Sequence, residues 1–588
     1  MTSEHGWMRV CSPSDIPIGE SHAVKIDAGR SIALFNQNGK IFATDNQCPH
    51  MGYPLTRGVV NGGVLTCDWH GRSFDLEGGG CFNYECDDLE TFVVEIREGG
   101  VWVELGDGTY KRKDQHLRLL WEGLLSRDSW TISKAIALLL SGGVSENNIV
   151  ELILRHLGRH IATSRGAEEG GEIISLLISG LKVGKRYEGE DRLMALSLAG
   201  RAASGSASDR LDVIALPPPV TWVQLEGWIR EFSRNMQDGR IERCLYTARE
   251  NNYEDKIFKL LYECAVAPHY SGFPRNLTYL SDLAEVVNEF GWVDSSELVC
   301  NLAAKMIGQG RAEPESLHRE ALRLMADLLP DIESHNYELN TKTDFNERAL
   351  VEAILSVNID RAFKSISEAI HDGVSIQRLI TSFVLLAADR MARTPVDVDA
   401  GWGALSTEFN LAASLRIAYK YGGPSVAAKG LFHAAWLTFS NRWINIPLRD
   451  LQDPLSHGEL TVSNAEQGTD QIVNSIRSLN VHGVTDEVLG YLGTDFSSNS
   501  LLKEIGGAVL WDDTNLQLLS TLRAIFDEWD HVNSGDVALG DGHPARHQLL
   551  VGLARYATDV RLNKNSMASI NTAMRFSEGR TTVEVFDT

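Results

Sequence analysis

The hydrophobic pattern of this chain changes its period near residue 112. Before that point, short runs of β-branched and aromatic residues alternate with turn residues, which predicts strands, with a type I′ hairpin turn at Asn38-Gly39. The expected strands cover residues 23–26, 32–35, 41–44, 64–66, 91–96 and 101–104. Beyond residue 112, apolar residues recur three and four positions apart, which predicts amphipathic helices. We therefore expect a multidomain fold, with a small all-β domain over residues 1–112 and a large all-α helical-repeat domain over residues 113–588.

The helical region contains an internal repeat. A shift of 230 residues places Lys134 on Lys364 and Gly143 on Gly373 without a gap, and a shift of 121 residues relates a weaker middle copy to the last one. Each copy is expected to be a helical hairpin that buries its apolar face against its neighbours. A further helical part should follow the repeated units, which are expected near residues 117–216, 222–330 and 345–447.

Composition narrows the classes of function. The chain has 55 Lys and Arg against 79 Asp and Glu, and its net charge of −24 disfavours nucleic acid and anionic membranes as partners. No segment approaches the roughly 18 uninterrupted apolar residues of a membrane span, and the first ten residues lack a signal-peptide stretch. We expect a cytoplasmic protein with no membrane partner. The eight cysteines are sparse for a disulfide scaffold and cluster in the first hundred residues, which favours metal binding.

Two short segments of the β region combine cysteine with histidine. Cys48 and His50 lie in the first segment, and Cys67 and His70 lie in the second. Two thiolates and two imidazoles on two loops form the ligand set of a Rieske [2Fe–2S] centre, in which cysteines hold one iron and histidines the other. The same residue types can bind one zinc ion tetrahedrally, so zinc is the competing interpretation.

The segment from about residue 8 to 106 closely resembles the Rieske ferredoxin domains found alone or fused to bacterial oxygenases. It shares with them the C-x-H pair, a gap of 16 residues, the C-x-x-H-G run and a following F-D. Gly52 and Gly71 near the two pairs would let backbone N–H groups approach bridging sulfides. High-potential respiratory members carry serine and tyrosine where this chain has Arg72 and Phe74. The resemblance therefore implies a [2Fe–2S] cofactor of low reduction potential, about −150 mV.

The run from Leu350 to Pro447 contains Gly373-Val374, Ala387-Ala388-Asp389-Arg390, Trp402 and the segment 430–435. With these residues it resembles the helical questin-oxidase-like proteins, some of which carry an N-terminal Rieske domain. The resemblance implies a non-haem iron oxygenase that acts on aromatic or polyketide-type small molecules through a histidine-rich iron site. His433 matches the family pattern and is the expected catalytic residue, although an imidazole in such an apolar run can also be a buried, hydrogen-bonded histidine. Family members usually have histidine where residues 194–200 and 405–410 lie, and this chain has none there. The candidate ligands of a second, mononuclear iron are His116, His156, His160, His269 and His433.

Two hypotheses follow for the whole chain. In the first, a low-potential Rieske cluster relays electrons from a separate reductase or ferredoxin to an oxygen-activating iron in the helical domain, which acts on a small-molecule substrate. In the second, a Rieske electron carrier is fused to a helical scaffold without a second metal and serves as a partner subunit of another enzyme. No dinucleotide-binding fingerprint is present, so the electrons must come from another protein. The sequence leaves the oligomeric state open, although an adjacent subunit would bring the acceptor close to the cluster.

Overall fold

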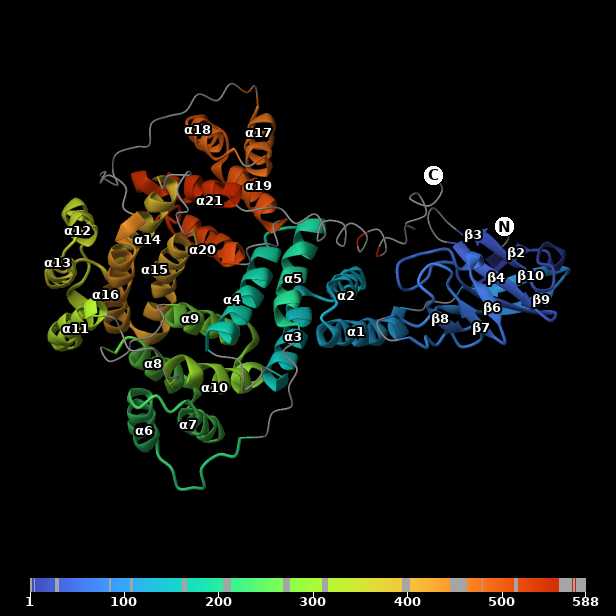
Figure 1. Cartoon of the computed structure of the whole chain (residues 1–588), viewed down its shortest axis with the longest axis horizontal. Helices are drawn as coiled ribbons and strands as arrows, with labels where there is room; N and C mark the ends of the chain where they lie inside the picture. Colours follow the sequence, from blue (N-terminus) through green and yellow to red (C-terminus); the bar gives the residue numbers. More distant parts are fainter. Residues whose placement is uncertain are drawn as a thin grey trace. The chain divides into compact units, whose positions relative to one another are not determined.

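A small β region precedes a long series of helices (Figure 1). This architecture comes from a computed structural model, and it confirms the predicted fold class. The model describes residues 3–559 except 5, 27–30, 84–85, 106–108, 161–166, 205–212, 268–274, 309–315, 394–401, 445–461, 463, 479 and 512–516, together with residues 574 and 577.

The strands follow the predicted segments and add short ones between them. Seven strands form one sheet in the order β1-β2-β10-β9-β5-β4-β3, and three form a second sheet in the order β6-β7-β8. Asn38 and Gly39 have φ of 54° and 90° and connect β4 to β5 in the predicted two-residue turn. The strands are β1 (Ser3–Glu4), β2 (Trp7–Cys11), β3 (Ser21–Lys25), β4 (Ser31–Gln37), β5 (Lys40–Asp45), β6 (Val59–Asn61), β7 (Val64–Thr66), β8 (Ser73–Asp75), β9 (Thr91–Arg97) and β10 (Gly100–Glu104).

Strand β4 contributes to two hydrophobic cores because its successive side chains point to opposite faces. Ile32 and Leu34 enter a core with residues of β10, whereas Ala33 and Phe35 enter a second core. The second core also contains Leu65 and Phe74 together with the cysteines of both predicted ligand pairs. The loops that carry these cysteines are therefore anchored to the packed interior of the β region.

The helices cover most of the remaining described residues. They are α1 (Thr109–Ser126), α2 (Ser129–Ser141), α3 (Glu146–His160), α4 (Ala167–Gly184), α5 (Gly189–Ala203), α6 (Trp222–Arg234), α7 (Asp238–Glu250), α8 (Glu254–Ala265), α9 (Arg275–Phe290), α10 (Trp292–Gly308), α11 (Ser316–Ser334), α12 (Glu347–Ile354), α13 (Ile359–His371), α14 (Ile376–Arg393), α15 (Trp402–Gly422), α16 (Pro424–Ser440), α17 (Ala465–Arg477), α18 (Val481–Leu492), α19 (Ser498–Leu510), α20 (Gln517–His531) and α21 (Gln548–Asp559).

The chain separates into two compact units whose limits differ from the sequence division at residue 112. The first unit contains Met1–Val150 and Gly184–Ala207, so that α1, α2 and α5 belong with the strands. The second contains Glu151–Val183 and Ser208–Asn563. Within the first unit, α2 packs against both α1 and α5. The domain limits expected from the sequence stay a prediction.

Helical hairpins of one construction recur at the spacing of the sequence repeat. A shift of 230 residues brings the bounds of α2 onto those of α13, and a shift of 121 residues brings α7 onto α13. The turn after each helix holds one residue in the left-handed region: Gly143 at φ 79°, Asn252 at φ 55° and Gly373 at φ 82°. These are the residue types that adopt this conformation at little cost, so the turn residues end the helices at matching places.

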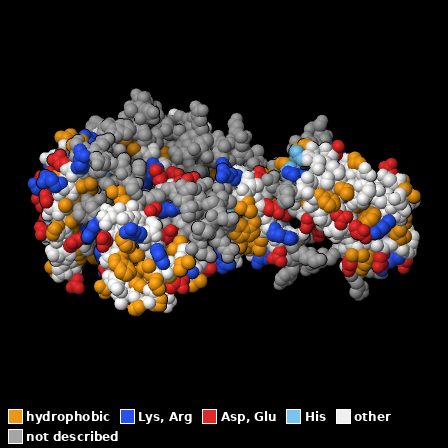
Figure 2. All heavy atoms as spheres, turned by 60° about the horizontal axis from the view of Figure 1, so that its bottom comes forward, with side chains coloured by type: hydrophobic (Ala, Val, Ile, Leu, Met, Phe, Trp, Pro, Cys, Tyr) orange, Lys and Arg blue, Asp and Glu red, His pale blue; other side chains and the backbone are white. Residues whose placement is uncertain are grey.

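Charged side chains of both signs are interspersed on the described part of the face in Figure 2. Within the described residues, no helix combines the length and the apolar character that crossing a membrane would require.

Candidate metal centre

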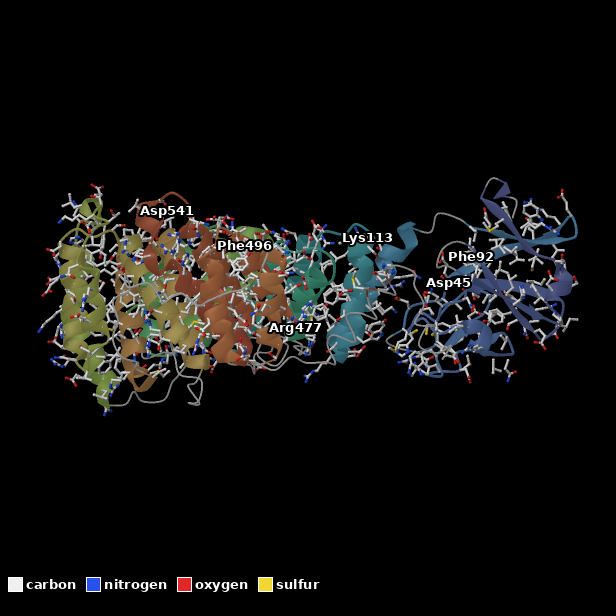
Figure 3. The ribbon with its side chains drawn as sticks, turned by 90° about the horizontal axis from the view of Figure 1, so that it is seen from above. Asp45, Phe92, Lys113, Arg477, Phe496 and Asp541 are labelled. Atoms are coloured by element: carbon white, nitrogen blue, oxygen red, sulfur yellow. The ribbon has the colours of Figure 1, made fainter. Side chains whose placement is uncertain are left out.

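Two loops carry the predicted cysteine and histidine pairs and share one backbone pattern. The first loop follows β5, whose end is marked in Figure 3 by Asp45, and the second joins β7 to β8. In the first loop the N–H of Cys48 donates to the carbonyl of Tyr53 at 2.8 Å, five residues later. In the second, the N–H of Cys67 donates to the carbonyl of Arg72 at 2.8 Å, again five residues later. Each cysteine therefore sits at the entrance of a tightly closed turn.

A glycine closes each turn four residues after the cysteine. The N–H of Gly52 donates to the Cys48 carbonyl at 2.7 Å, and the N–H of Gly71 donates to the Cys67 carbonyl at 3.1 Å. Their φ values of 77° and 66° lie in the left-handed region, which glycine adopts most readily. The two glycines noted in the sequence thus reverse the chain around the ligand positions.

The four predicted ligands pair by chemical type. Cys48 and Cys67 are 1% and 2% exposed, and their thiol groups are hydrogen-bonded to each other. The rings of His50 and His70 meet edge to face with centroids 4.8 Å apart; the first is partly buried and the second is exposed. The structure therefore brings the two thiols together in the core and the two imidazoles together beside them, with His70 exposed to solvent.

The protonation states suit metal binding. Hydrogen bonds from Cys67 and Cys86 lower the pKa of the Cys48 thiol to about 3, and the same bond to Cys48 raises the pKa of Cys67. Burial and the nearby Arg72 guanidinium lower the pKa of His50 to about 4. In the described part of the chain, the buried Nδ1 atom of His50 has no hydrogen-bond partner. An unpartnered neutral imidazole beside a thiolate is a donor set that fits an iron–sulfur cluster.

A site for one metal ion has less support. Among the described residues, no three His, Cys, Asp or Glu side chains gather where they could hold a single metal ion. This supports neither tetrahedral zinc at the four predicted ligands nor a mononuclear second iron. A [2Fe–2S] cluster does not need such convergence, because cysteines and histidines hold different irons.

The expected ligands of the second iron fall in different parts of the chain. His116 belongs to the first compact unit, whereas His156 and His433 belong to the second. The side chain of His160 lies outside the described residues, as does the whole of His269. Among the described side chains of this set, the structure shows no cluster that could hold a metal ion.

His433, the expected catalytic residue, lies on α16 and is partly buried. Its Nε2 atom lies 3.3 Å from the carbonyl of Val266. Burial lowers the pKa of His433 to about 4, so the ring is neutral at pH 7 and can donate its N–H to this carbonyl. The contact fits the alternative of a buried, hydrogen-bonded histidine that the sequence left open.

Sequence reasoning missed two residues of α2 that contact the first cysteine loop. The Trp130 indole N–H donates to the carbonyl of His50 at 3.1 Å, and the Lys134 ammonium donates to the carbonyl of Pro49. The sequence showed Lys134 only as a matched position of the helical repeat. Since this contact joins residues 85 positions apart, no local pattern could reveal it.

Comparison with known proteins places these loops in a recognised domain. A model of the Rieske [2Fe-2S] domain matches residues 6–93. The ferredoxin component of the p-cumate 2,3-dioxygenase system from Pseudomonas putida is 31% identical over 16% of this chain and 84% of its own length. The structure of Sphingomonas yanoikuyae B1 ferredoxin is 32% identical over 17% of this chain and 98% of its own, with a TM-score of 0.16.

A longer relative matches a stretch of similar length. Human apoptosis-inducing factor 3 is 34% identical over 95 residues, and the chain spans 16% of the length of that protein. Like the p-cumate ferredoxin component, it matches 16% of this chain. Through its N-terminal domain, the chain belongs to the Rieske [2Fe–2S] family.

Proposed function

We propose that this chain is an electron-transfer protein whose Rieske cluster is held by Cys48, His50, Cys67 and His70. The observation that carries the proposal is the pairing of two buried thiols with two imidazoles on loops of matching backbone geometry. When bound, a [2Fe–2S] group supplies one-electron oxidation and reduction. The neutral imidazole of His50 and the thiolate of Cys48 are the forms that bind iron.

The electron donor is a separate reductase or ferredoxin, since the sequence has no dinucleotide-binding fingerprint. The p-cumate relative is named as the ferredoxin component of a dioxygenase system, which supports a relay role for the N-terminal domain. The exposed ring of His70 and the exposed side of Trp69 are the part of the site that a donor can reach. The expected midpoint potential is low, about −150 mV.

The test is reconstitution of the full chain with iron and sulfide. We expect two irons per chain, with the visible absorption and the reduced-state paramagnetic resonance spectrum of a Rieske cluster. Cys67→Ser should abolish these signals, whereas Cys11→Ser, at a partly buried cysteine of β2 outside the loops, should retain them. A colourless protein that holds one zinc ion would refute the proposal.

A second candidate function assigns oxygenase chemistry to the helical region, as its resemblance to questin-oxidase-like proteins implies. A cavity of about 310 Å³ in the second unit supports small-molecule binding there. Arg275, Tyr279 and Asn410 line it, and His433 does not belong to its lining. The cavity and the expected iron ligand are thus separate features, which weakens this candidate relative to a carrier fused to a helical scaffold.

Iron content separates the two candidates. In the double variant Cys48→Ser/Cys67→Ser, an iron that remains bound and is then lost with His433→Ala supports the oxygenase with an aromatic or polyketide-type substrate. Complete loss of iron in the double variant supports the carrier with a helical scaffold, which acts as a partner subunit of another enzyme.

A further inference from the structure

Helix α2 places a buried positive charge against the first cysteine loop. Lys134 is 1% exposed, its ammonium donates to the Pro49 carbonyl, and it lies 3.4 Å from the carboxylate of Asp87. One turn earlier, Trp130 donates to the carbonyl of His50 at 3.1 Å. The helix therefore holds two successive carbonyls of the loop that contains a predicted ligand pair.

Packing alone does not account for a lysine at this position. The neighbouring buried residues of α2 include Ile132, Ala135, Ile136 and Leu139. An ammonium group loses its hydration when it is buried among such side chains, and that loss must be offset by good charge and hydrogen-bond partners. A methionine would fill similar volume without the loss, so the charge of Lys134 is the property to be explained.

The helical repeat supplies an internal comparison. The matching position of α13 is Lys364, whose side chain is 61% exposed and bonds to Asp360 at 2.6 Å. The matching position of α7 is Arg243, which is exposed and donates to the carbonyl of Ile214 at 3.0 Å. All three hairpins thus have a basic residue here, and of the three it is Lys134 that lies against the cysteine loop.

We propose that Lys134 raises the reduction potential of the Rieske centre by holding a buried positive charge beside the Cys48–His50 loop. The inference rests on the proposed electron-transfer function. Reduction adds one negative charge to the centre, and a fixed cation nearby stabilises the reduced form more than the oxidised form. Because Lys134 is buried, mobile ions screen this effect only weakly.

Asp87 acts in the opposite direction to Lys134. Its carboxylate is 14% exposed and contacts the Lys134 ammonium. Of these two charged groups, it is the ammonium that bonds to the cysteine loop, at the Pro49 carbonyl. Removal of the lysine charge should therefore favour the oxidised form twice over, since the cation is lost and the Asp87 carboxylate is left unpaired. Removal of the carboxylate charge should favour the reduced form.

The test is a redox titration of the reconstituted full chain, followed by visible absorption and paramagnetic resonance. At a fixed applied potential, Lys134→Met should lower the ratio of reduced to oxidised cluster about tenfold. This corresponds to a decrease of the midpoint potential by ~59 mV for a one-electron couple. Lys134→Arg should restore most of the wild-type potential, and Asp87→Asn should raise it. Lys364→Met, the same substitution at the matched exposed position, should leave the potential unchanged.

Intact cluster spectra separate this inference from the proposed function. A wild-type chain that binds no cluster refutes the function itself. Normal cluster spectra with an unchanged midpoint potential in Lys134→Met overturn the inference alone. Shifts of the same sign in Lys134→Met and Asp87→Asn also overturn it, because loosening of the loop, and not charge, would then explain both. If Lys134→Met fails to fold, the upward shift expected for the more conservative Asp87→Asn decides the matter.

Discussion

Glu347 is expected to be a principal electrostatic support of the second unit. It begins α12 and is 3% exposed. Its carboxylate accepts from Arg378 at 2.9 Å and from Ser382 at 2.6 Å, and it contacts Nε2 of His543 at 2.9 Å. The other ring nitrogen of His543 accepts from the N–H of Ala545 at 3.0 Å, so both nitrogens of this histidine have structural partners.

The magnitude follows from the pKa of Glu347. Burial alone would raise it, but the hydrogen bond from His543 and the charge of Arg378 outweigh burial and lower the pKa from 4.5 to about 2. At about 1.4 kcal/mol per pKa unit, this corresponds to roughly 3 kcal/mol of stability. Glu347→Gln should therefore lower the free energy of unfolding at pH 7 by about 3 kcal/mol, because it also leaves the Arg378 charge buried and unpaired.

The pH dependence has a definite sign. A carboxyl whose pKa is lower in the folded state stabilises the protein above its unfolded pKa and loses that contribution as the pH falls. The difference in the free energy of unfolding between wild type and Glu347→Gln should have its full value above about pH 5 and should shrink as the pH falls toward 2. Urea unfolding, monitored by far-ultraviolet circular dichroism, measures the free-energy difference at pH 7 and at pH 3.

A matched control lies on the same helix. Glu352 pairs with the exposed Arg348 at 3.0 Å, so Glu352→Gln should cost less than about 1 kcal/mol. Equal losses in the two variants would refute the reasoning. The reasoning would also be refuted if the free-energy difference between wild type and Glu347→Gln stayed constant down to low pH.

Three glycine substitutions test the geometry of the loops and of the helical packing. In Gly71→Ala the new methyl group meets no neighbouring atom but the residue is strained at φ +66°, so the variant should lose about 1 kcal/mol of stability and retain less cluster. Gly39→Ala, at φ +90° in the β4–β5 turn, is the control: it should lose a similar amount of stability but retain the full cluster. Equal retention in the two variants, measured by iron content, would contradict this. In Gly430→Ala the new methyl group would overlap the side chain of Leu415, so thermal unfolding should show a loss of about 1–3 kcal/mol. Unchanged stability would contradict this and would show that the Leu415 side chain moves aside without cost.

The strands and the closed loops around the predicted ligand pairs could be anticipated because short-range chemistry decides them. Asn38 and Gly39 tolerate positive φ, and the bonds that close each cysteine loop join residues four and five positions apart. The consecutive apolar residues of β4, which enter two cores, likewise follow from the geometry of one strand. Residues this close in the chain meet in nearly any fold that contains them, so the sequence alone indicated how the loops around the four predicted ligands close.

The environment of single side chains in the helical region was decided by tertiary structure. His433 lies in an apolar run that is compatible with either a buried histidine or a metal ligand, and its partner, the Val266 carbonyl, is 167 residues away. Lys134 and Lys364 occupy matching places in repeated hairpins, yet one is buried against a cysteine loop and the other is in solvent. Local sequence determines that a helix forms and where it ends. Contacts between segments far apart in the chain decide which neighbour covers a given helix face, and therefore whether a charged side chain there is hydrated or buried. No local sequence pattern records these contacts.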